Sequence, residues 1–494
     1  MLAASKQFFY FGRVASLRPV YFLKNKKKVP SRQLHQSAKM TMISLSPPAA
    51  HSSAGSAGPL IRAKLVRETS DNLQACSERL RSGKLVAFPT ETVYGLGCHA
   101  LHEDAVQAVF SAKKRPLTDP LIVHVLDAPA AFELWQAKLP DHENWEGTDT
   151  ESSSSNNNNH LTPVTTLEGQ ILWKLCQSFW PGPLTLVARA NRRVVPDVVM
   201  AGTGFVACRS PSHGTARSLL QVSQLPLAAP SANKFGHVSP TKAQHVWDDL
   251  HDEDVWILEP KQTEEEKMDQ SLSMSCCQVG VESTVAKLEV GEDADNESPN
   301  VPAVLTVLRQ GAVSVQDLET CLQGMNVRVQ SKQHQVISED VAAVAPGQSI
   351  RHYSPNIPSY MVSKSLQATL RSSTLTNNGL NSDASLSHFL TDTERQLLSE
   401  TVIIDYGQTL AVLKSAALEY RDLSPSANST EAAQVVFETL RWAERVEGAS
   451  RIVLANLGLE GDDTNKKAEA LELAIQDRLT RAASGVTIDR LDAL

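Results

Sequence analysis

The chain has 494 residues, 41% of them hydrophobic, which is enough for two or three domains with buried cores. The formal net charge of −8 is uneven: residues 1–40 contain nine Lys and Arg and no acids, which leaves 38 basic against 55 acidic residues elsewhere. Such an acidic body argues against an extended nucleic-acid-binding face. No apolar run reaches the ~18 residues of a membrane helix. The seven cysteines lack metal-site spacing, so we expect reduced thiols in an intracellular protein.

Residues 1–42 are rich in Lys, Arg, Ser, Phe and Leu and lack acids, which is typical of a mitochondrial presequence. A disordered basic tail is the alternative interpretation. Met40 and Met42 are candidate internal starts, so we expect mitochondrial and cytoplasmic forms. Residues 43–59, rich in Ser, Ala, Gly and Pro, are typical of a disordered linker.

Residues 71–125 predict a helix ending at Gly83, a strand over Leu85–Phe88, a loop, a second helix and a strand over Leu121–Val125. The loop after the first strand contains Thr90, Thr92 and two glycines, so hydroxyls and backbone N–H groups are available there. Lys113 and Arg115 follow the second helix, and His124 lies at the end of the second strand. On the residues alone, a phosphate site and simple compensation of the helix dipole are equally good interpretations.

The next segments add polar residues at further strand ends. A helix precedes a strand over Leu184–Ala188, and a strand over Phe205–Cys208 leads to Arg209. A strand over Leu225–Ala229 leads to Ser231, Asn233 and Ser239, residue types that most often only form turns. Residues 282–284 (Glu-Ser-Thr) begin another strand, and Arg309 ends a later one. Three polar segments, 141–166, 260–278 and 291–300, predict disordered inserts.

A second domain is predicted after a Pro-containing linker. Residues 344–358 contain three Pro and no apolar period, and they include His352 and Tyr353. Residues 401–407 and 451–458 are β-type apolar runs, with amphipathic segments at 417–425 and 432–446 between them and a final helix over 468–485. This alternation is typical of a small parallel α/β domain. The sequence of this domain contains no GxGxxG motif, so we do not predict a dinucleotide site there.

Five motifs resemble the YrdC-type threonylcarbamoyl-AMP synthases in the family's order: PTETVYGLG with KKRPLTDPLIVH, WPGPLTLV, SAN, EST, and LRQG. The RHYSP segment is similar to the linker of the family's two-domain branch. The resemblance implies an α/β fold with a twisted mixed sheet around a concave cleft over 60–329. It further implies an interdomain linker over 330–358 that closes over the site, and a smaller Rossmann-like domain over 359–494.

The resemblance also implies a reaction: L-threonine, bicarbonate and ATP give threonylcarbamoyl-AMP and pyrophosphate, by an enzyme of the nucleotidyltransferase class. Lys113 and Arg115 would be catalytic, and Mg²⁺ would accompany ATP, with no dedicated protein metal site. His124 would be a hydrogen-bonding ligand residue, with a general base as the alternative. The implied ATP-binding residues are Lys113, Arg115, Asp119, Ser231, Asn233, Ser239, Arg309, His352 and Tyr353. The implied threonine-binding residues are Thr92, His124, Arg209, Ala229 and Ser283.

The expected product would pass to a partner transferase that forms N6-threonylcarbamoyladenosine on the tRNA adenosine beside the anticodon, with at most a weak tRNA contact and no membrane contact. Two alternatives remain open. The same cleft could serve as an RNA-binding module without ATP turnover, or a related domain could transfer carbamoyl groups in hydrogenase maturation. The latter usually comes with zinc-finger segments, and the absence of Cys pairs disfavours it here.

Overall fold

The computed structural model describes residues 62–139, 166–261, 277–291, 302–331, 352–376, 390–458 and 470–494. All of them lie in one compact unit, Gly58–Leu494. The expected presequence, the 43–59 linker, nearly all of the three inserts and residues 332–351 of the interdomain linker lie outside the described residues. No helix among the described residues is long and apolar enough to cross a membrane.

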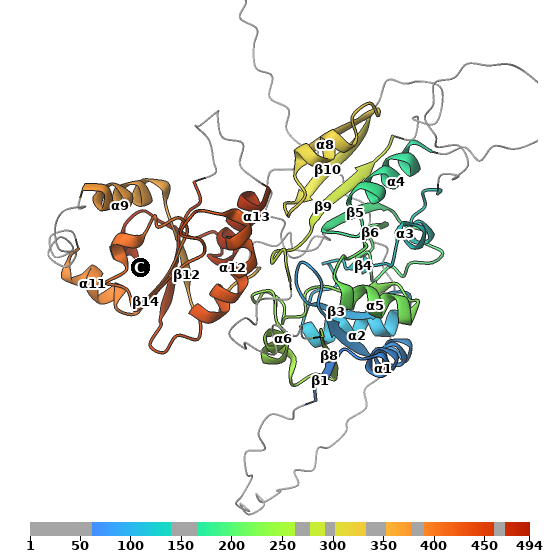
Figure 1. Ribbon diagram of the computed structural model, residues 1–494, viewed down its shortest axis with the longest axis horizontal. Coiled ribbons are helices and arrows are strands. Elements are labelled where there is room, and N and C mark those ends of the chain that lie inside the picture. The colour runs from blue at the N-terminus through green and yellow to red at the C-terminus, as the bar shows by residue number, and fades with distance from the viewer. Residues whose placement is uncertain are drawn as a thin grey trace, which may run out of the picture. The chain divides into compact units, whose positions relative to one another are not determined.

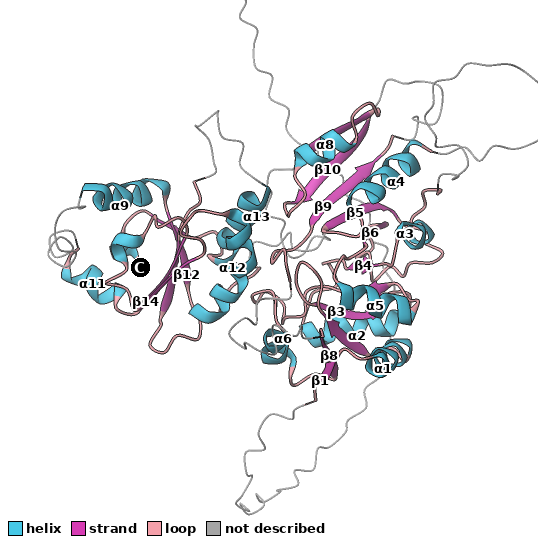
Figure 2. Ribbon diagram, viewed as in Figure 1, coloured by secondary structure: helices cyan, strands magenta, loops and turns pink. Residues whose placement is uncertain are grey.

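The larger sheet is mixed and carries the order β1-β8-β2-β3-β7-β4-β6-β5-β9-β10-β11 within the described residues (Figures 1 and 2). Its strands are β1 (Lys64–Arg67), β2 (Leu85–Phe88), β3 (Gly95–His99), β4 (Ile122–His124), β5 (Leu184–Arg189), β6 (Phe205–Arg209), β7 (Leu227–Ala228), β8 (Val255–Glu259), β9 (Thr284–Glu289), β10 (Ala303–Arg309) and β11 (Val327–Ser331). Its helices are α1 (Ser70–Arg81), α2 (Glu103–Lys113), α3 (Ala128–Leu134), α4 (Leu167–Phe179), α5 (Gly214–Ser223), α6 (Ala243–Leu250) and α8 (Val315–Cys321).

Strand alternation gives this sheet two different faces. Leu184, Leu186 and Ala188 of β5 lie in the main core, which also contains residues of α3, α4 and α8. Of those helices, α3 contacts β6, α4 contacts β9 and α8 contacts β11 (Figure 1). The alternate residue Val187 belongs instead to a small cluster with Ile122, Ala207 and Val285. This second face leads to the strand ends at which the candidate site residues lie.

The smaller sheet is entirely parallel, with the order β14-β13-β15-β12-β16. Its strands are β12 (Ser359–Val362), β13 (Thr401–Asp405), β14 (Glu419–Asp422), β15 (Arg451–Leu454) and β16 (Thr487–Ile488). Its helices are α9 (Lys364–Thr376), α11 (Asp392–Leu398), α12 (Ser429–Ala443) and α13 (Ala470–Ala482), with short 3-10 helices at Ala411–Leu413 and Leu491–Ala493. The expected α/β class, a twisted mixed sheet with a smaller parallel α/β domain, is therefore confirmed.

Three local predictions differ from the structure. Residues 95–99 form β3 rather than a loop, and β3 pairs antiparallel with β2. A side-chain pattern could not reveal this strand because Gly97 lies against Phe88, where a Cβ would come within 2.6 Å of the ring. The segment 417–425 contains β14 rather than a helix, at the edge of the parallel sheet. The strand expected over Leu225–Ala229 is also shorter, because only Leu227–Ala228 forms ladder pairs.

Loops of the larger domain contribute to the core of the smaller domain. The hydrophobic cluster of the smaller domain includes Val93, Val238 and Val281, which belong to loops of the larger domain. Gly280, next to Val281, has a φ of +79° and approaches α12 so closely that a Cβ would lie 2.2 Å from the Ala433 carbonyl oxygen. The loops that carry the candidate site are therefore packed against the smaller domain, which we call the accessory domain.

Candidate active site

The loop after β2 is organised by one hydroxyl. Thr90 Oγ1 donates to the Val93 carbonyl at 2.7 Å and accepts from the backbone N–H groups of Thr92 and Val93. It also lies 2.9 Å from Thr92 Oγ1. These bonds fold the Pro89–Thr92 segment into a tight turn and fix the Thr92 hydroxyl at the pocket.

Arg209 and His124 meet at one edge of the sheet because β4 and β6 are parallel and pair His124 with Arg209. Arg209 donates to Thr92 Oγ1 at 3.0 Å and to Glu91 Oε2 at 3.4 Å. Both arginine and glutamate are buried, and within the described residues Arg209 Nε and Glu91 Oε1 have no hydrogen-bond partner. A buried guanidinium with a spare donor is suited to a ligand carboxylate.

The His124 ring is held neutral. Burial, followed by the charge of Arg209, holds the pKa of His124 well below its usual value. The ring packs edge-to-face on Phe88 at 5.9 Å between centroids, and Nδ1 has no partner among the described residues. A neutral imidazole with so low a pKa is a weak base at pH 7, which favours a hydrogen-bonding role over general-base catalysis.

Lys113 and Arg115, at the end of α2, have different surroundings. Lys113 Nζ donates to the carbonyls of Ser231 (2.6 Å) and Asn233, so it supports the loop after β7 from behind and does not line the pocket. Arg115 lines the pocket and pairs with Asp119 at 2.8 Å. Asp119 does not line the pocket, and its carboxylate orients the Arg115 guanidinium from behind the wall.

The loop after β7 lines the pocket with its first residues, whereas Asn233 and Ser239 lie behind the wall. Ser231 lines the pocket beside Ala229. Asn233 is buried and donates to the carbonyls of Lys234 and His237, which closes the loop on itself. Ser239 Oγ donates to Glu282 Oε1 at 2.6 Å. Asn233 and Ser239 thus shape the loop and do not form the wall.

Ser283 and Arg309 lie together where β9 begins and β10 ends. Arg309 donates to the Ser283 carbonyl at 3.1–3.2 Å and to its hydroxyl at 3.3 Å, and that hydroxyl lies 2.7 Å from Thr185 Oγ1. Burial lowers the pKa of Arg309 from its usual value. Arg309 lines the pocket, whereas Ser283 lies behind it.

His352 and Tyr353 bring the end of the interdomain linker into the pocket. Their rings are 4.2 Å apart, and His352 also packs edge-to-face on Phe235 at 6.1 Å. Tyr353 has a left-handed backbone conformation, with a φ of 63°. The next residue, Ser354, donates its backbone N–H to the Gly236 carbonyl. Burial raises the pKa of Tyr353 to about 12 and, with the charge of Arg115, lowers that of His352 far below its usual value.

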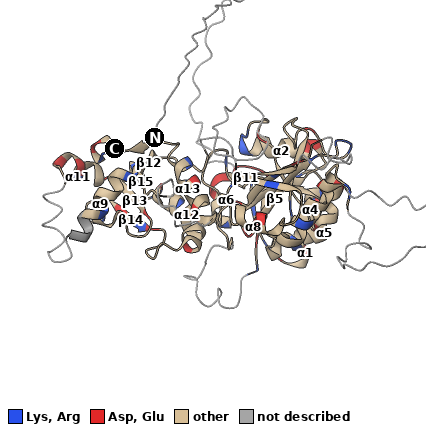
Figure 3. Cartoon of the chain, turned by 90° about the horizontal axis from the view of Figure 1, so that it is seen from above, with Lys and Arg blue, Asp and Glu red and all other residues tan. Residues whose placement is uncertain are grey.

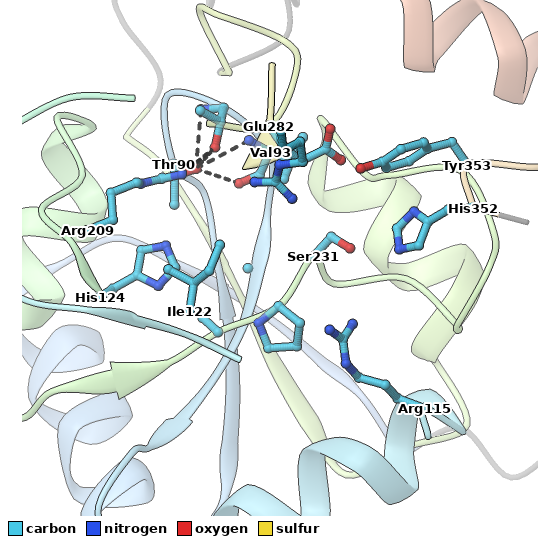
Figure 4. Close-up of a pocket in the computed structure, with 15 residues that line it drawn as sticks. Thr90, Val93, Arg115, Ile122, His124, Arg209, Ser231, Glu282, His352 and Tyr353 are labelled. Atoms are coloured by element: carbon cyan, nitrogen blue, oxygen red, sulfur yellow. Dashed lines mark hydrogen bonds between the residues drawn. The ribbon is translucent and has the colours of Figure 1, made fainter. Parts of the chain in front are cut away.

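The pocket therefore has two ends (Figure 4). Arg209 and His124 lie at one end, His352 and Tyr353 at the other, and Ser231 lies between them, with Arg115 below. Of the fourteen predicted residues, the lining includes nine: Thr92, Arg115, His124, Arg209, Ala229, Ser231, Arg309, His352 and Tyr353. The other five, Lys113, Asp119, Asn233, Ser239 and Ser283, lie in the supporting layer. Among the described residues, no cluster of three or more His, Cys, Asp or Glu could hold a metal ion.

Two family models match successive parts of the chain. The model Sua5_yciO_yrdC, described as "Telomere recombination", matches residues 78–149 and 153–296. The model described as "Threonylcarbamoyl-AMP synthase, C-terminal domain" matches residues 313–484. The chain belongs to the YrdC-type threonylcarbamoyl-AMP synthase family, in its two-domain form.

Relatives within this family include the threonylcarbamoyl-AMP synthase of Pyrococcus abyssi, 36% identical over 56% of this chain and 64% of that protein. Those of Schizosaccharomyces pombe (33% identical, 58% and 63%) and Bacillus subtilis (32%, 56% and 63%) are similar. The chain thus spans just under two thirds of the length of these relatives. The crystal structure of P. abyssi Sua5 complexed with L-threonine is 28% identical, with a TM-score of 0.58, over 87% of this chain and 99% of that one.

Six lining residues were missed as site residues although the family motifs contain most of them: Thr90, Val93, Gly95, Ile122, Pro230 and Glu282. Thr90 lies two residues before Thr92 in the PTET motif, and Glu282 lies next to Ser283 in the EST motif. Ile122 could have been found from alternation, because it is two residues before His124 on β4 and shares its face. Val93 could not, since it belongs to a loop whose packing partner is the accessory domain.

Proposed function

We propose that this protein is an L-threonylcarbamoyladenylate synthase. The amine of L-threonine would form a bond with the carbon of bicarbonate, with loss of water, to give a carbamate. A carbamate oxygen would then attack the α-phosphorus of ATP, and pyrophosphate would leave as threonylcarbamoyl-AMP forms. The observation that carries the proposal is one buried pocket with a spare arginine donor at one end and a second arginine, a hydroxyl and two aromatic rings towards the other.

The threonine end would be the Arg209 end. Arg209 would bind the carboxylate, while Thr92 and the neutral His124 would bind the amine or hydroxyl. Ala229 would contribute only shape, since Gly95 lies against it with room for little more than its methyl group. Ser283 would act indirectly through Arg309.

The ATP end would depend on positioning and charge neutralisation, since phosphoryl chemistry of this kind needs no covalent intermediate. Arg115, Arg309 and Ser231 would contact phosphates, and His352 and Tyr353 would contact the nucleotide. Lys113 and Asn233 would hold the Ser231 loop, which makes Lys113 a positioning residue in this arrangement.

Mg²⁺ would enter with ATP, bound mainly by phosphate oxygens. The donors present fit this use, because Ser231 offers a hydroxyl at the pocket wall while the described residues contain no carboxylate cluster for a dedicated site. Ser231 would be the protein contact of the ion. When bound, the ion would neutralise charge on the phosphates.

The nucleotidyltransferase product would feed N6-threonylcarbamoyladenosine formation on tRNA through a partner transferase. A form that begins at Met1 would enter mitochondria, and a form that begins at Met40 or Met42 would remain cytoplasmic. Fluorescent fusions of Met1–Leu494 and Met42–Leu494 test this proposal. We expect a mitochondrial signal only from the longer fusion, and a mitochondrial signal from the shorter one would contradict it.

An RNA-binding module that uses the same pocket is the second candidate. In the view of Figure 3, Lys and Arg are interspersed with Asp and Glu over the described elements, which does not favour a phosphate-backbone track. The pocket cations are also buried and already paired with Glu91, Asp119 or Ser283. A long polyanion has little access to such groups.

Pyrophosphate release from ATP by the purified chain tests the synthase proposal. Threonine and bicarbonate are each omitted in turn, and we expect release only when both are present. Arg115→Ala and Ser231→Ala should lower that release by at least tenfold, whereas Arg189→Ala, at an exposed position on β5, should not. ATP turnover that does not depend on threonine, or the absence of turnover in folded protein, would favour the RNA-binding alternative. Titration with tRNA at several salt concentrations would then test that alternative.

A further inference from the structure

The accessory domain contributes one arginine to the back of the pocket. Arg478 on α13 is completely buried, and its Nε donates to Glu282 Oε2 at 3.1 Å. Its NH1 group donates to the Gln310 carbonyl at 2.8 Å and its NH2 group to the Glu282 carbonyl at 3.5 Å. One guanidinium thus contacts the chain before β9 and the chain after β10, which are the two segments that flank Ser283 and Arg309.

Glu282 connects this arginine to the loop after β7. The carboxylate lines the pocket, receives Ser239 Oγ on one oxygen at 2.6 Å and receives Arg478 on the other. The side chain is only 8% exposed, so a lone negative charge there would be costly without its arginine. Loss of Arg478 would leave the carboxylate free to move or to repel phosphates that enter the pocket.

Arg478 also contacts a second lining residue. Its guanidinium carbon lies 5.6 Å from the centroid of the Tyr353 ring, within the range of a cation–π contact. The Tyr353 ring also packs on the ring of Phe437 of α12, with 5.3 Å between the ring centroids, so it has an apolar neighbour as well. The position of Tyr353 at the pocket therefore depends on the accessory domain.

We propose that Arg478 is a positioning residue of the active site: it holds the carboxylate of Glu282, and through it Ser239, together with the ring of Tyr353, in the arrangement that accepts ATP. The inference rests on the proposed synthase function. It gives the accessory domain a defined part in catalysis, since the domain supplies the counter-charge that makes the pocket wall compatible with a polyphosphate.

The test compares Arg478→Met with Arg441→Met in the full-length chain. Arg441 on α12 is equally buried and also crosses to the larger domain, where it pairs with Asp249 at 3.0 Å, but neither residue lines the pocket. We expect Arg478→Met to raise the KM for ATP about 10- to 100-fold, in line with loss of a charged hydrogen bond. Arg441→Met should lower the Tm similarly and leave the KM for ATP within about threefold.

Two further variants keep the inference testable if Arg478→Met folds poorly. Arg478→Lys retains one charged contact and should recover part of the affinity for ATP. Glu282→Gln combined with Arg478→Met removes the unpaired charge and should bind ATP more tightly than Arg478→Met alone. Equal KM changes in the two arginine variants, or no gain from either rescue, would overturn the inference. An inactive wild-type chain would instead reject the synthase function itself.

Discussion

At the scale of single residues, the end of the pocket that we propose for threonine contains charges that are almost fully paired. Arg209 contacts Glu91 and Thr92 and retains Nε without a partner among the described residues. Removing the arginine would therefore leave Glu91 without its cation in a buried position, in addition to removing the proposed ligand of the threonine carboxylate. Substitutions at this residue should be read together with a stability measurement.

The first prediction concerns Arg209. Arg209→Lys keeps the charge but loses the planar fork, so the KM for threonine should rise about 10- to 100-fold while the KM for ATP changes little. Steady-state pyrophosphate release at varied threonine measures this split. Arg189→Lys on the neighbouring strand is the control and should behave as wild type. A rise in the KM for ATP equal to that for threonine would contradict the assignment.

The second prediction concerns acid stability. His352 has a pKa far below the ~6.5 of an unfolded chain, so below pH ~6.5 the unfolded state binds a proton that the folded state does not. Stability should therefore fall as the pH drops, by up to about 1.4 kcal/mol per pH unit for this residue. His352→Phe keeps an aromatic ring and should make the decline from pH 6.5 to 5 shallower in urea unfolding. The control is His251→Asn, at the end of α6, which should retain the wild-type slope. An unchanged slope in His352→Phe would show that His352 does not contribute to the loss of stability in acid.

At the scale of elements, strand ends could be predicted better than loop partners. The strands that deliver His124 and Arg209 follow from short apolar runs bounded by Pro, Gly and polar residues, and their predicted ends agree with the structure to within one residue. The strand predicted to end at Arg309 does end there. The supporting roles of Lys113, Asn233 and Ser239 could not be predicted, because a motif names a residue type without showing which way its side chain points. Edge strand β14 was missed because its alternation also fits one turn of an amphipathic helix.

The third prediction uses two glycines with similar backbone conformations. Gly280 and Gly324 both have a positive φ, but only Gly280 meets another element, the backbone of α12. Gly324→Ala should cost about 1 kcal/mol of unfolding free energy for its φ alone. Gly280→Ala should cost at least twice as much, because the new methyl group collides with main chain that cannot move aside. Equal losses in urea unfolding would mean that α12 is not packed against this turn.

At the scale of the whole molecule, an ionic cluster joins the larger domain to α12. His237 lies 2.9 Å from Asp249 and 3.0 Å from Glu444, and Arg441 also pairs with Asp249. Burial opposes a charged ring, but the hydrogen bonds to Asp249 and Glu444 outweigh it and raise the pKa of His237 above its usual value. The ring therefore keeps its proton to a higher pH than an ordinary histidine does, and it lies between two carboxylates at the boundary of the domains.

The fourth prediction follows from the sign of that shift. A raised pKa contributes stability that is fully present below pH ~6.5 and is lost as the pH rises through the folded-state pKa. Glu444→Gln keeps a hydrogen-bonding side chain but removes one charge, so it should lose less stability than the wild type between pH 6 and pH 8.5. Urea unfolding at the two pH values measures the difference. The exposed Glu447→Gln is the matched control, and a Glu444→Gln variant that tracks it would rule out the coupling.

Three valines of the larger domain, Val93, Val238 and Val281, are members of the accessory domain's core. They are adjacent in sequence to Thr92, Ser239 and Glu282, so each valine connects a residue of the site directly to the core of the accessory domain. A chimera that joins this larger domain to the accessory domain of a relative would present these valines with a foreign core. Such exchanges should succeed only when the three positions are transplanted with the core that receives them, and the two halves are thus constrained to diverge together.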